Sequence, residues 1–175
     1  MKLLIFGTLN HQHIQNFAKS LKRELGYSLI GVNNNSNIRA QFEAETSEIF
    51  DIHYNVTRLN NPLDVICKFI SSIICFCKGC SNKVDIVQFH FVSFYVLPLL
   101  LIAKKKQIKT SVFVYGSDML RSGGFYHKYC DLVFNVADSV VCDSTTLCEQ
   151  LKSKYLDKND KIECVLFGSV IIDKL

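Results

Sequence analysis

Short, uninterrupted apolar runs recur along this chain, and each is followed by a glycine or polar residue and then by an amphipathic segment. The runs are Lys2–Phe6, Tyr27–Val32, Ile49–Tyr54, Asp85–Phe91, Lys109–Tyr115, Ser139–Cys142 and Lys161–Leu166. Continuous rather than alternating apolar character is typical of strands that are buried on both faces of a sheet. The pattern predicts an α/β fold: a doubly wound, mostly parallel, Rossmann-like sheet of about seven strands with helices on both faces.

The segments between these runs have the spacing of helices. Ile14, Phe17, Leu21 and Leu25 fall on one helical face, and Gly26 follows as a candidate C-cap. The other expected helices are residues Ala40–Ser47, Pro62–Lys78 closed by Gly79, Tyr95–Lys106, Tyr126–Val136, and Thr145–Tyr155 with Ser144 as its N-cap.

Length and composition limit the class of protein. The chain has 175 residues, of which 49% are hydrophobic and 21% charged, and its formal net charge is +4. This predicts one globular domain, 1–175, and not a disordered chain. The charge is too mild and too dispersed to indicate a nucleic-acid partner.

The cysteines indicate the cellular compartment of the protein, and the apolar segments indicate whether it contacts a membrane. The chain has eight cysteines but lacks the small, loop-rich character of a disulfide scaffold and a signal-like N-terminus, so we expect reduced thiols and a cytoplasmic location. Cys75, Cys77 and Cys80 have no second ligand pair, so no metal is predicted. Val65–Phe76 is too short to span a bilayer. With the lysines of Lys104–Lys109 it suggests peripheral contact with an anionic membrane, although those lysines also suit a solvated helix end.

Ligands of open parallel sheets bind outside the carboxyl ends of the strands, which directs attention to the residues there. The loop Gly7–His13 leads into a helix N-terminus, a site that favours anions. It contains Thr8, and His11 and His13 could supply a proton or a positive charge, unless they are simply exposed. The loop lacks both the dinucleotide fingerprint and the P-loop, which disfavours nicotinamide cofactors.

Two later strand ends carry further candidates. His90, between two phenylalanines, is either a buried core residue or a ligand-facing one. After the strand ending at Tyr115, Gly116 allows close approach of a ligand, and Ser117, Asp118 and Arg121 offer groups that hold sugar hydroxyls and phosphate. Ser117 or Asp118 would serve equally well as a helix cap.

Four segments in order resemble the N-terminal half of retaining GT-B glycosyltransferases of the group 1, family 4-like kind. DIVQFHFVSFYVLPLLLIAKKKQI resembles a strand with a His-x-His ending and its following helix, and TSVFVYGSDMLR resembles a strand ending in His-Gly-Ser-Asp. VADSVVCDSTTLCEQL and KIECVLFGSVIIDKL resemble the next two strands, the second of which leads to an interdomain linker. The resemblance covers nearly the whole chain.

The resemblance implies transfer of a sugar, with retention, from a nucleotide-sugar donor to a glycan or lipid-linked acceptor, as in polysaccharide biosynthesis. It implies no bound cofactor and no metal, and a C-terminal donor-binding domain that these 175 residues do not include, supplied by the same or a separate chain. The substrate- and donor-binding residues it implies are Gly7, Thr8, His11, His13, His90, Tyr115, Gly116, Ser117, Asp118, Arg121 and Ser144. No general base is assigned.

Departures from the family pattern leave alternatives open. Tyr115 stands where the family often has histidine, and Phe167–Val170 replaces an Asn-Gly-Val-Asp segment. The isolated chain is expected to fold without catalysing transfer. The main alternative is a non-catalytic Rossmann-like module that binds a sugar or nucleotide, or docks to the catalytic partner of a split transferase. A phosphoacceptor domain is disfavoured, because no acidic cluster follows the first strand.

Overall fold

A seven-stranded parallel sheet organises the chain. The computed structural model describes residues 1–34, 46–57, 63–116 and 124–165. The strands are β1 (Lys2–Gly7), β2 (Ser28–Asn33), β3 (Ile52–Asn55), β4 (Ile86–His90), β5 (Lys109–Val114), β6 (Ser139–Cys142) and β7 (Ile162–Cys164). Their order is β3-β2-β1-β4-β5-β6-β7, and every neighbouring pair is parallel. The predicted α/β fold is therefore confirmed.

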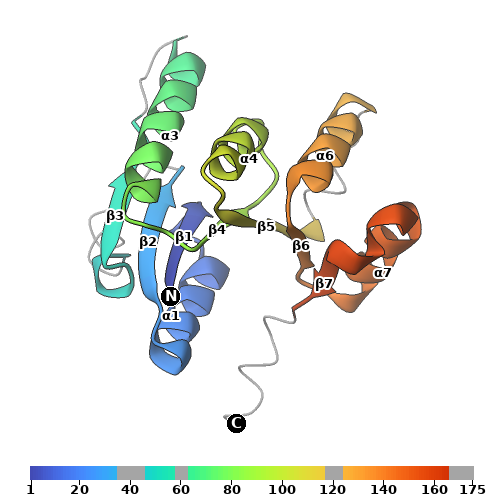
Figure 1. Cartoon of the computed structure of the whole chain (residues 1–175), viewed down its shortest axis with the longest axis horizontal. Coiled ribbons are helices and arrows are strands. Elements are labelled where there is room, and N and C mark those ends of the chain that lie inside the picture. The colour runs from blue at the N-terminus through green and yellow to red at the C-terminus, as the bar shows by residue number, and fades with distance from the viewer. Residues whose placement is uncertain (35–45, 58–62, 117–123, 166–175) are drawn as a thin grey trace.

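Helices cover both faces of this sheet (Figure 1). They are α1 (Gln12–Leu25), α3 (Asp64–Cys80), α4 (Val96–Lys105), α6 (Gly124–Val136) and α7 (Thr145–Lys154), followed by a 3-10 helix at Leu156–Lys161. Alternate residues of β1 separate the two layers: Leu4 and Phe6 join the core beneath α3 and α4, whereas Leu3 and Ile5 pack against α1. Burial on both faces explains why the strands are continuously apolar.

The helix caps expected at Gly26 and Ser144 are present. Gly26 ends α1 in the left-handed region, with φ 64°, and its N–H donates to the Leu21 carbonyl. Ser144 begins α7, and its hydroxyl oxygen accepts a hydrogen bond from the Leu147 N–H at 3.3 Å. These caps satisfy backbone groups that have no partner within the helix.

Two local predictions were wrong. Ile49 lies in a helical turn, closed by the Phe50 N–H donating to the Thr46 carbonyl, and β3 begins only at Ile52. Gly79 does not end α3 but lies within its last turn, where a Cβ would be 2.5 Å from Cδ1 of Leu4. Glycine at that position lets the helix approach the sheet closely. Residues 40–45 of the expected helix Ala40–Ser47 lie outside the described ranges.

Two further predictions concerned the cysteines and membrane-spanning helices. All eight cysteines are free thiols, as expected for reduced cysteines. None of the described helices combines the length and hydropathy needed to cross a bilayer.

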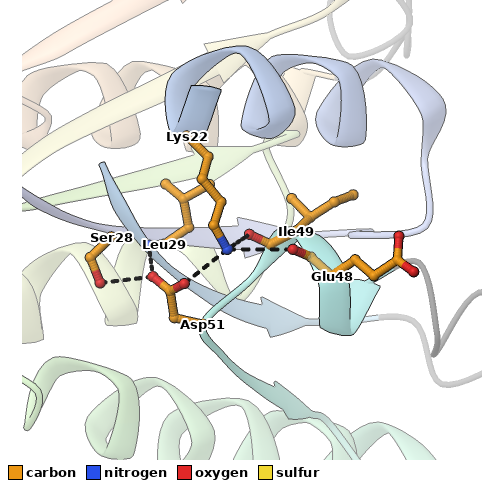
Figure 2. Close-up of polar contacts among 6 residues, drawn as sticks. All are labelled: Lys22, Ser28, Leu29, Glu48, Ile49 and Asp51. Carbon is orange, nitrogen blue, oxygen red and sulfur yellow. Dashed lines mark hydrogen bonds and ion pairs between the residues drawn. The ribbon is translucent and has the colours of Figure 1, made fainter. Parts of the chain in front are cut away.

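Asp51 accepts hydrogen bonds that connect the start of β2 with its neighbouring segments (Figure 2). One carboxylate oxygen accepts hydrogen bonds from the Ser28 hydroxyl and the Leu29 N–H, each at 2.9 Å. The other accepts from the Lys22 ammonium at 2.9 Å, and Lys22 also donates to the carbonyl of Ile49 at 3.0 Å. The carboxylate thereby joins α1, β2 and the turn that precedes β3.

This network predicts a pH-dependent contribution to stability. Burial raises the pKa of Asp51, but the hydrogen bonds from Lys22, Ser28 and Leu29 outweigh it, so the pKa lies below its usual value. A lowered pKa stabilises the fold above the unfolded-state pKa, and this contribution is lost as pH falls through the folded-state pKa. Because the Asp51 side chain is 40% exposed, we expect Asp51→Asn to lower the free energy of unfolding at neutral pH by only about 1 kcal/mol.

Urea unfolding of both proteins across the acid range tests this. The stabilities of wild type and Asp51→Asn should converge as the pH falls below about 4, the usual aspartate value. Asp157→Asn is the control, because that carboxylate is 76% exposed and lies 3.5 Å from Lys158. A constant difference between wild type and Asp51→Asn at all pH values would contradict the role given to the Asp51 charge.

Candidate ligand-binding rim

Three neighbouring strands bring most of the predicted residues to one edge. β1, β4 and β5 are adjacent and parallel, so their carboxyl ends meet. Gly7 ends β1, His90 ends β4, and Tyr115 follows β5. Open parallel sheets bind ligands at such an edge. We call the edge formed by Gly7–His11, His90–Phe91 and Tyr115–Gly116 the rim.

The first loop of the rim is held by asparagines of the next strand. The Leu9 N–H donates to Oδ1 of Asn33 at 3.3 Å, and the Thr8 hydroxyl donates to Oδ1 of Asn34 at 3.0 Å. The Asn34 N–H donates to the Gly7 carbonyl at 2.9 Å. The sequence analysis did not identify this bracing role of Asn33 and Asn34. The signal for it was an amide side chain directly after an apolar strand.

His11 sits at the start of α1. It occupies the N-cap position in an extended conformation and its side chain makes no capping hydrogen bond. Its ring lies 5.2 Å from that of His13 and 5.7 Å, edge-on, from that of Phe91. Burial first, and His13 second, lower the pKa of His11 below its usual value. The His11 ring is therefore mostly uncharged at neutral pH, and the helix N-terminus beside it carries partial positive charge.

Phe91 has an unusual backbone conformation. Its φ is 71°, a left-handed value that is rare for a bulky residue. β4 therefore ends at His90, one residue before the predicted end of the strand at Phe91. Its ring stacks on Tyr115 with centroids 4.4 Å apart, and its N–H donates to the Phe113 carbonyl at 3.2 Å. Such backbone strain costs about 1–3 kcal/mol and is concentrated at functional sites. The sequence directed attention to the end of this strand but did not single out Phe91 as a binding residue.

His90 and Tyr115 form a buried hydrogen-bonded pair. Nδ1 of His90 lies 2.8 Å from the Tyr115 hydroxyl, and the two side chains are only 1% and 8% exposed. The imidazole also stacks on Phe113, with centroids 4.5 Å apart. A Cβ on Gly7 would lie 2.9 Å from Cβ of His90, so glycine is what admits the histidine here. Gly7, His90 and Tyr115 were all among the binding residues predicted from the sequence, but the contacts between them were not predicted.

The second ring nitrogen of His90, Nε2, is a hydrogen-bonding atom without a partner among the described residues. Burial, and to a smaller extent His11, lower the pKa of His90 to about 3, so its ring is neutral at neutral pH. A neutral imidazole has one N–H donor and one acceptor nitrogen. With Nδ1 paired to Tyr115, Nε2 is buried and has no hydrogen-bond partner among the described residues. Buried polar atoms in native proteins are nearly always paired, often by a ligand or an ordered water.

The remaining candidates differ in what the structure shows. No atom of the described chain lies within 4 Å of where a Cβ of Gly116 would be, so space is open beside that backbone. Ser117, Asp118 and Arg121 lie outside the described residues. Ser144 is one strand further along, after β6, and its hydroxyl caps α7. Within the described ranges, no three His, Cys, Asp or Glu side chains are grouped as metal ligands, and we assign none.

Known proteins resemble this chain in fold. No protein-family model matches it, and no curated protein sequence does. UDP-GlcNAc 2-epimerase from Neisseria meningitidis, bound to UDP-GlcNAc, aligns with a TM-score of 0.63 and 19% identity over 94% of this chain and 46% of its own. A putative UDP-N-acetylglucosamine 2-epimerase from Listeria monocytogenes aligns with a TM-score of 0.63 and 13% identity, over 92% of this chain and 44% of its own. MurG from Acinetobacter baumannii aligns with a TM-score of 0.53 and 13% identity, over 82% of this chain and 42% of its own.

These similarities show the fold alone. The chain has the Rossmann-like fold of an N-terminal GT-B domain, which both the epimerases and MurG share. It spans less than half the length of each of these three proteins. The narrower resemblance to the group 1 glycosyltransferases stays a prediction.

The contact between Gly7 and His90 predicts a position-specific effect of alanine. Gly7→Ala places a methyl group against Cβ of His90 and Cδ1 of Ile14, so we expect a loss of about 1–3 kcal/mol in unfolding free energy. The measurement is chemical denaturation. Gly116→Ala is the matched control and should change stability little, because the space there is open. Equal effects of the two substitutions would contradict the packing described.

Removing the Tyr115 hydroxyl tests the buried pair. Tyr115→Phe keeps the ring on Phe91 but leaves both nitrogens of His90 without a partner in the described chain, at an expected cost of about 1–3 kcal/mol. Tyr27→Phe is the control, because the Tyr27 hydroxyl makes no hydrogen bond within the described residues. If denaturation gave the same small change for both, the His90–Tyr115 bond would contribute nothing measurable.

Proposed function

We propose that this chain is the N-terminal, acceptor-side half of a glycosyltransferase that moves a sugar from a nucleotide-sugar donor to a glycan or lipid-linked acceptor in polysaccharide biosynthesis. The observation that supports it most is the meeting of Gly7, His90 and Tyr115 at the carboxyl edge of a GT-B-type sheet. Both epimerases described above are named for a sugar nucleotide and not for a transfer reaction, so the chemistry of transfer is the proposed part.

The rim offers the contacts that a sugar requires. Stacked aromatic rings, such as Phe91 on Tyr115, present apolar faces suited to the C–H face of a pyranose. Nε2 of His90 supplies a neutral hydrogen-bonding atom for a hydroxyl. The N-terminus of α1 presents free N–H groups toward an anion, as a diphosphate would need. These groups bind and orient, and fixed dipoles of this kind stabilise charge on a leaving group.

Division of labour between two domains is part of the proposal. The chain aligns with less than half of each matched protein, which supports a second domain, in the same or a separate chain, that carries most contacts to the nucleotide. On this account the 175-residue chain alone folds but does not transfer sugar. The expected location is the cytoplasm, at the inner face of a membrane when the acceptor is lipid-linked.

Product analysis separates transfer from its alternatives. The chain is incubated, together with the second domain in one protein or as a complex, with nucleotide sugars and candidate acceptors, and products are identified by mass spectrometry. Transfer yields a free nucleoside diphosphate and an acceptor enlarged by one sugar. Epimerisation yields a nucleotide sugar of unchanged mass, and a non-catalytic docking module yields neither product from its own rim.

Variants connect the activity to the rim. We expect Tyr115→Phe and Asp118→Ala to lower kcat/KM about tenfold or more, the effect of losing about 1.4 kcal/mol of transition-state stabilisation. His127→Gln is the control and should retain activity, because His127 on α6 is not one of the rim residues and its ring lies 3.5 Å from the Lys154 ammonium of α7. Undiminished turnover in both Tyr115→Phe and Asp118→Ala would contradict the assignment, and so would robust transfer by the 175-residue chain alone.

A further inference from the structure

The outward face of α3 is apolar, which is unusual for a helix that covers a sheet. Five apolar side chains on or just before this helix are between 48% and 69% exposed: Leu63, Val65, Ile66, Ile70 and Ile74. The buried side of α3 is formed by Ser72, Phe76, Gly79 and Cys80. A surface helix normally has such a buried side together with polar residues on its outward face, so the apolar outward face is the unusual feature of α3. The outward face of α3 is therefore suited to a second apolar contact.

The exposed isoleucines form one stripe. Ile66, Ile70 and Ile74 are spaced four residues apart, which places them in a row about 12 Å long on one side of a helix. Figure 1 shows α3 at the margin of its helical layer, over β2 and β3, with α4 as its neighbour on one side only. We call Leu63, Val65, Ile66, Ile70 and Ile74 the α3 stripe.

Positive charge borders the α3 stripe. The ammonium of Lys68 lies 5.3 Å from the centroid of the Tyr95 ring, and Lys78 is exposed near the end of the helix. Lys106 lies close to the same end, because its charge opposes the rise in the pKa of Cys80 to about 11 that burial and Cys77 cause. Asp64 is the one acidic residue within α3. Lys104, which the sequence had suggested for membrane contact, is instead paired with Asp138.

The stripe begins at the level of the rim. α3 connects the parallel strands β3 and β4, so it runs opposite to them and starts near their carboxyl ends. Phe94, which is 61% exposed, lies in the loop that leaves the rim after β4. The ring of the adjacent Tyr95 lies 6.3 Å from that of Phe69 on α3, so aromatic contacts connect this loop with the helix. A surface bound to the stripe would thus lie beside the rim.

We propose that the α3 stripe docks this chain on an anionic lipid bilayer, with α3 lying in the plane of the interface. A row of isoleucines bordered by lysines is the arrangement by which interfacial helices bind anionic membranes. The helix has 17 residues, fewer than the about 20 that a span needs. A second copy of the chain fits less well, because pairing two stripes brings the lysines of both copies together. The proposal does not depend on sugar transfer.

Vesicle co-sedimentation of the 175-residue chain tests the proposal. We expect binding to vesicles of phosphatidylcholine mixed with phosphatidylglycerol, and weaker binding to phosphatidylcholine alone. The triple variant Ile66→Ser, Ile70→Ser, Ile74→Ser should reduce binding about tenfold or more, and Lys68→Gln with Lys78→Gln should remove the preference for anionic lipid. Leu25→Ser is the matched control: it is 58% exposed, ends α1 on the other face of the sheet, and should bind as wild type does.

Three outcomes would overturn the proposal. The first is that wild type sediments with neither kind of vesicle. The second is that the triple variant binds as wild type does. The third, seen by analytical ultracentrifugation, is concentration-dependent dimerisation that the triple variant abolishes, which would make a second copy the occupant of the stripe. Circular dichroism confirms that each variant is folded. Because vesicle binding is measured without substrate, a failure here leaves the transferase proposal untouched, and the reverse also holds.

Discussion

The adjacency of β1, β4 and β5 in a parallel sheet determines where this protein can bind anything. Parallel strands end at the same edge, so the ends of these three strands place Gly7, His90 and Tyr115 together although they are far apart in sequence. The absence of a side chain at Gly7 lets His90 approach β1, and the Tyr115 hydroxyl then holds one of its ring nitrogens. The other ring nitrogen, Nε2, is buried and has no hydrogen-bond partner among the described residues.

Burial gives this rim a neutral character. The pKa values of His11 and His90 are both lowered, mainly by burial, so neither ring contributes much positive charge at neutral pH. Among the described residues, the N-terminus of α1 offers attraction for an anion, because its N–H groups carry partial positive charge. Hydrogen bonding and ring stacking by His90, Phe91 and Tyr115 suit an uncharged sugar. The rim is thus better matched to orienting a sugar than to moving protons.

Sequence patterns predicted the layout of the molecule more fully than its local geometry. Continuous apolar strands report burial on both faces, so the sheet could be anticipated, and the caps at Gly26 and Ser144 followed from local backbone chemistry. Gly79 was misjudged because its glycine serves a contact with Leu4, distant in sequence. Phe91 was not singled out for a similar reason: its left-handed backbone, its stacking on Tyr115 and its hydrogen bond to the Phe113 carbonyl join segments that are distant in sequence, which no local pattern records.

Binding of a ligand at the rim is tested most directly at Nε2 of His90. Histidine side-chain 15N NMR, recorded while a nucleotide sugar or an acceptor glycan is titrated into the protein with its second domain, reports directly on that atom. The account predicts that the His90 Nε2 resonance moves with saturation of the site, while the resonances of His127, on α6, stay fixed. An unchanged His90 signal under conditions where the ligand is demonstrably bound would contradict it.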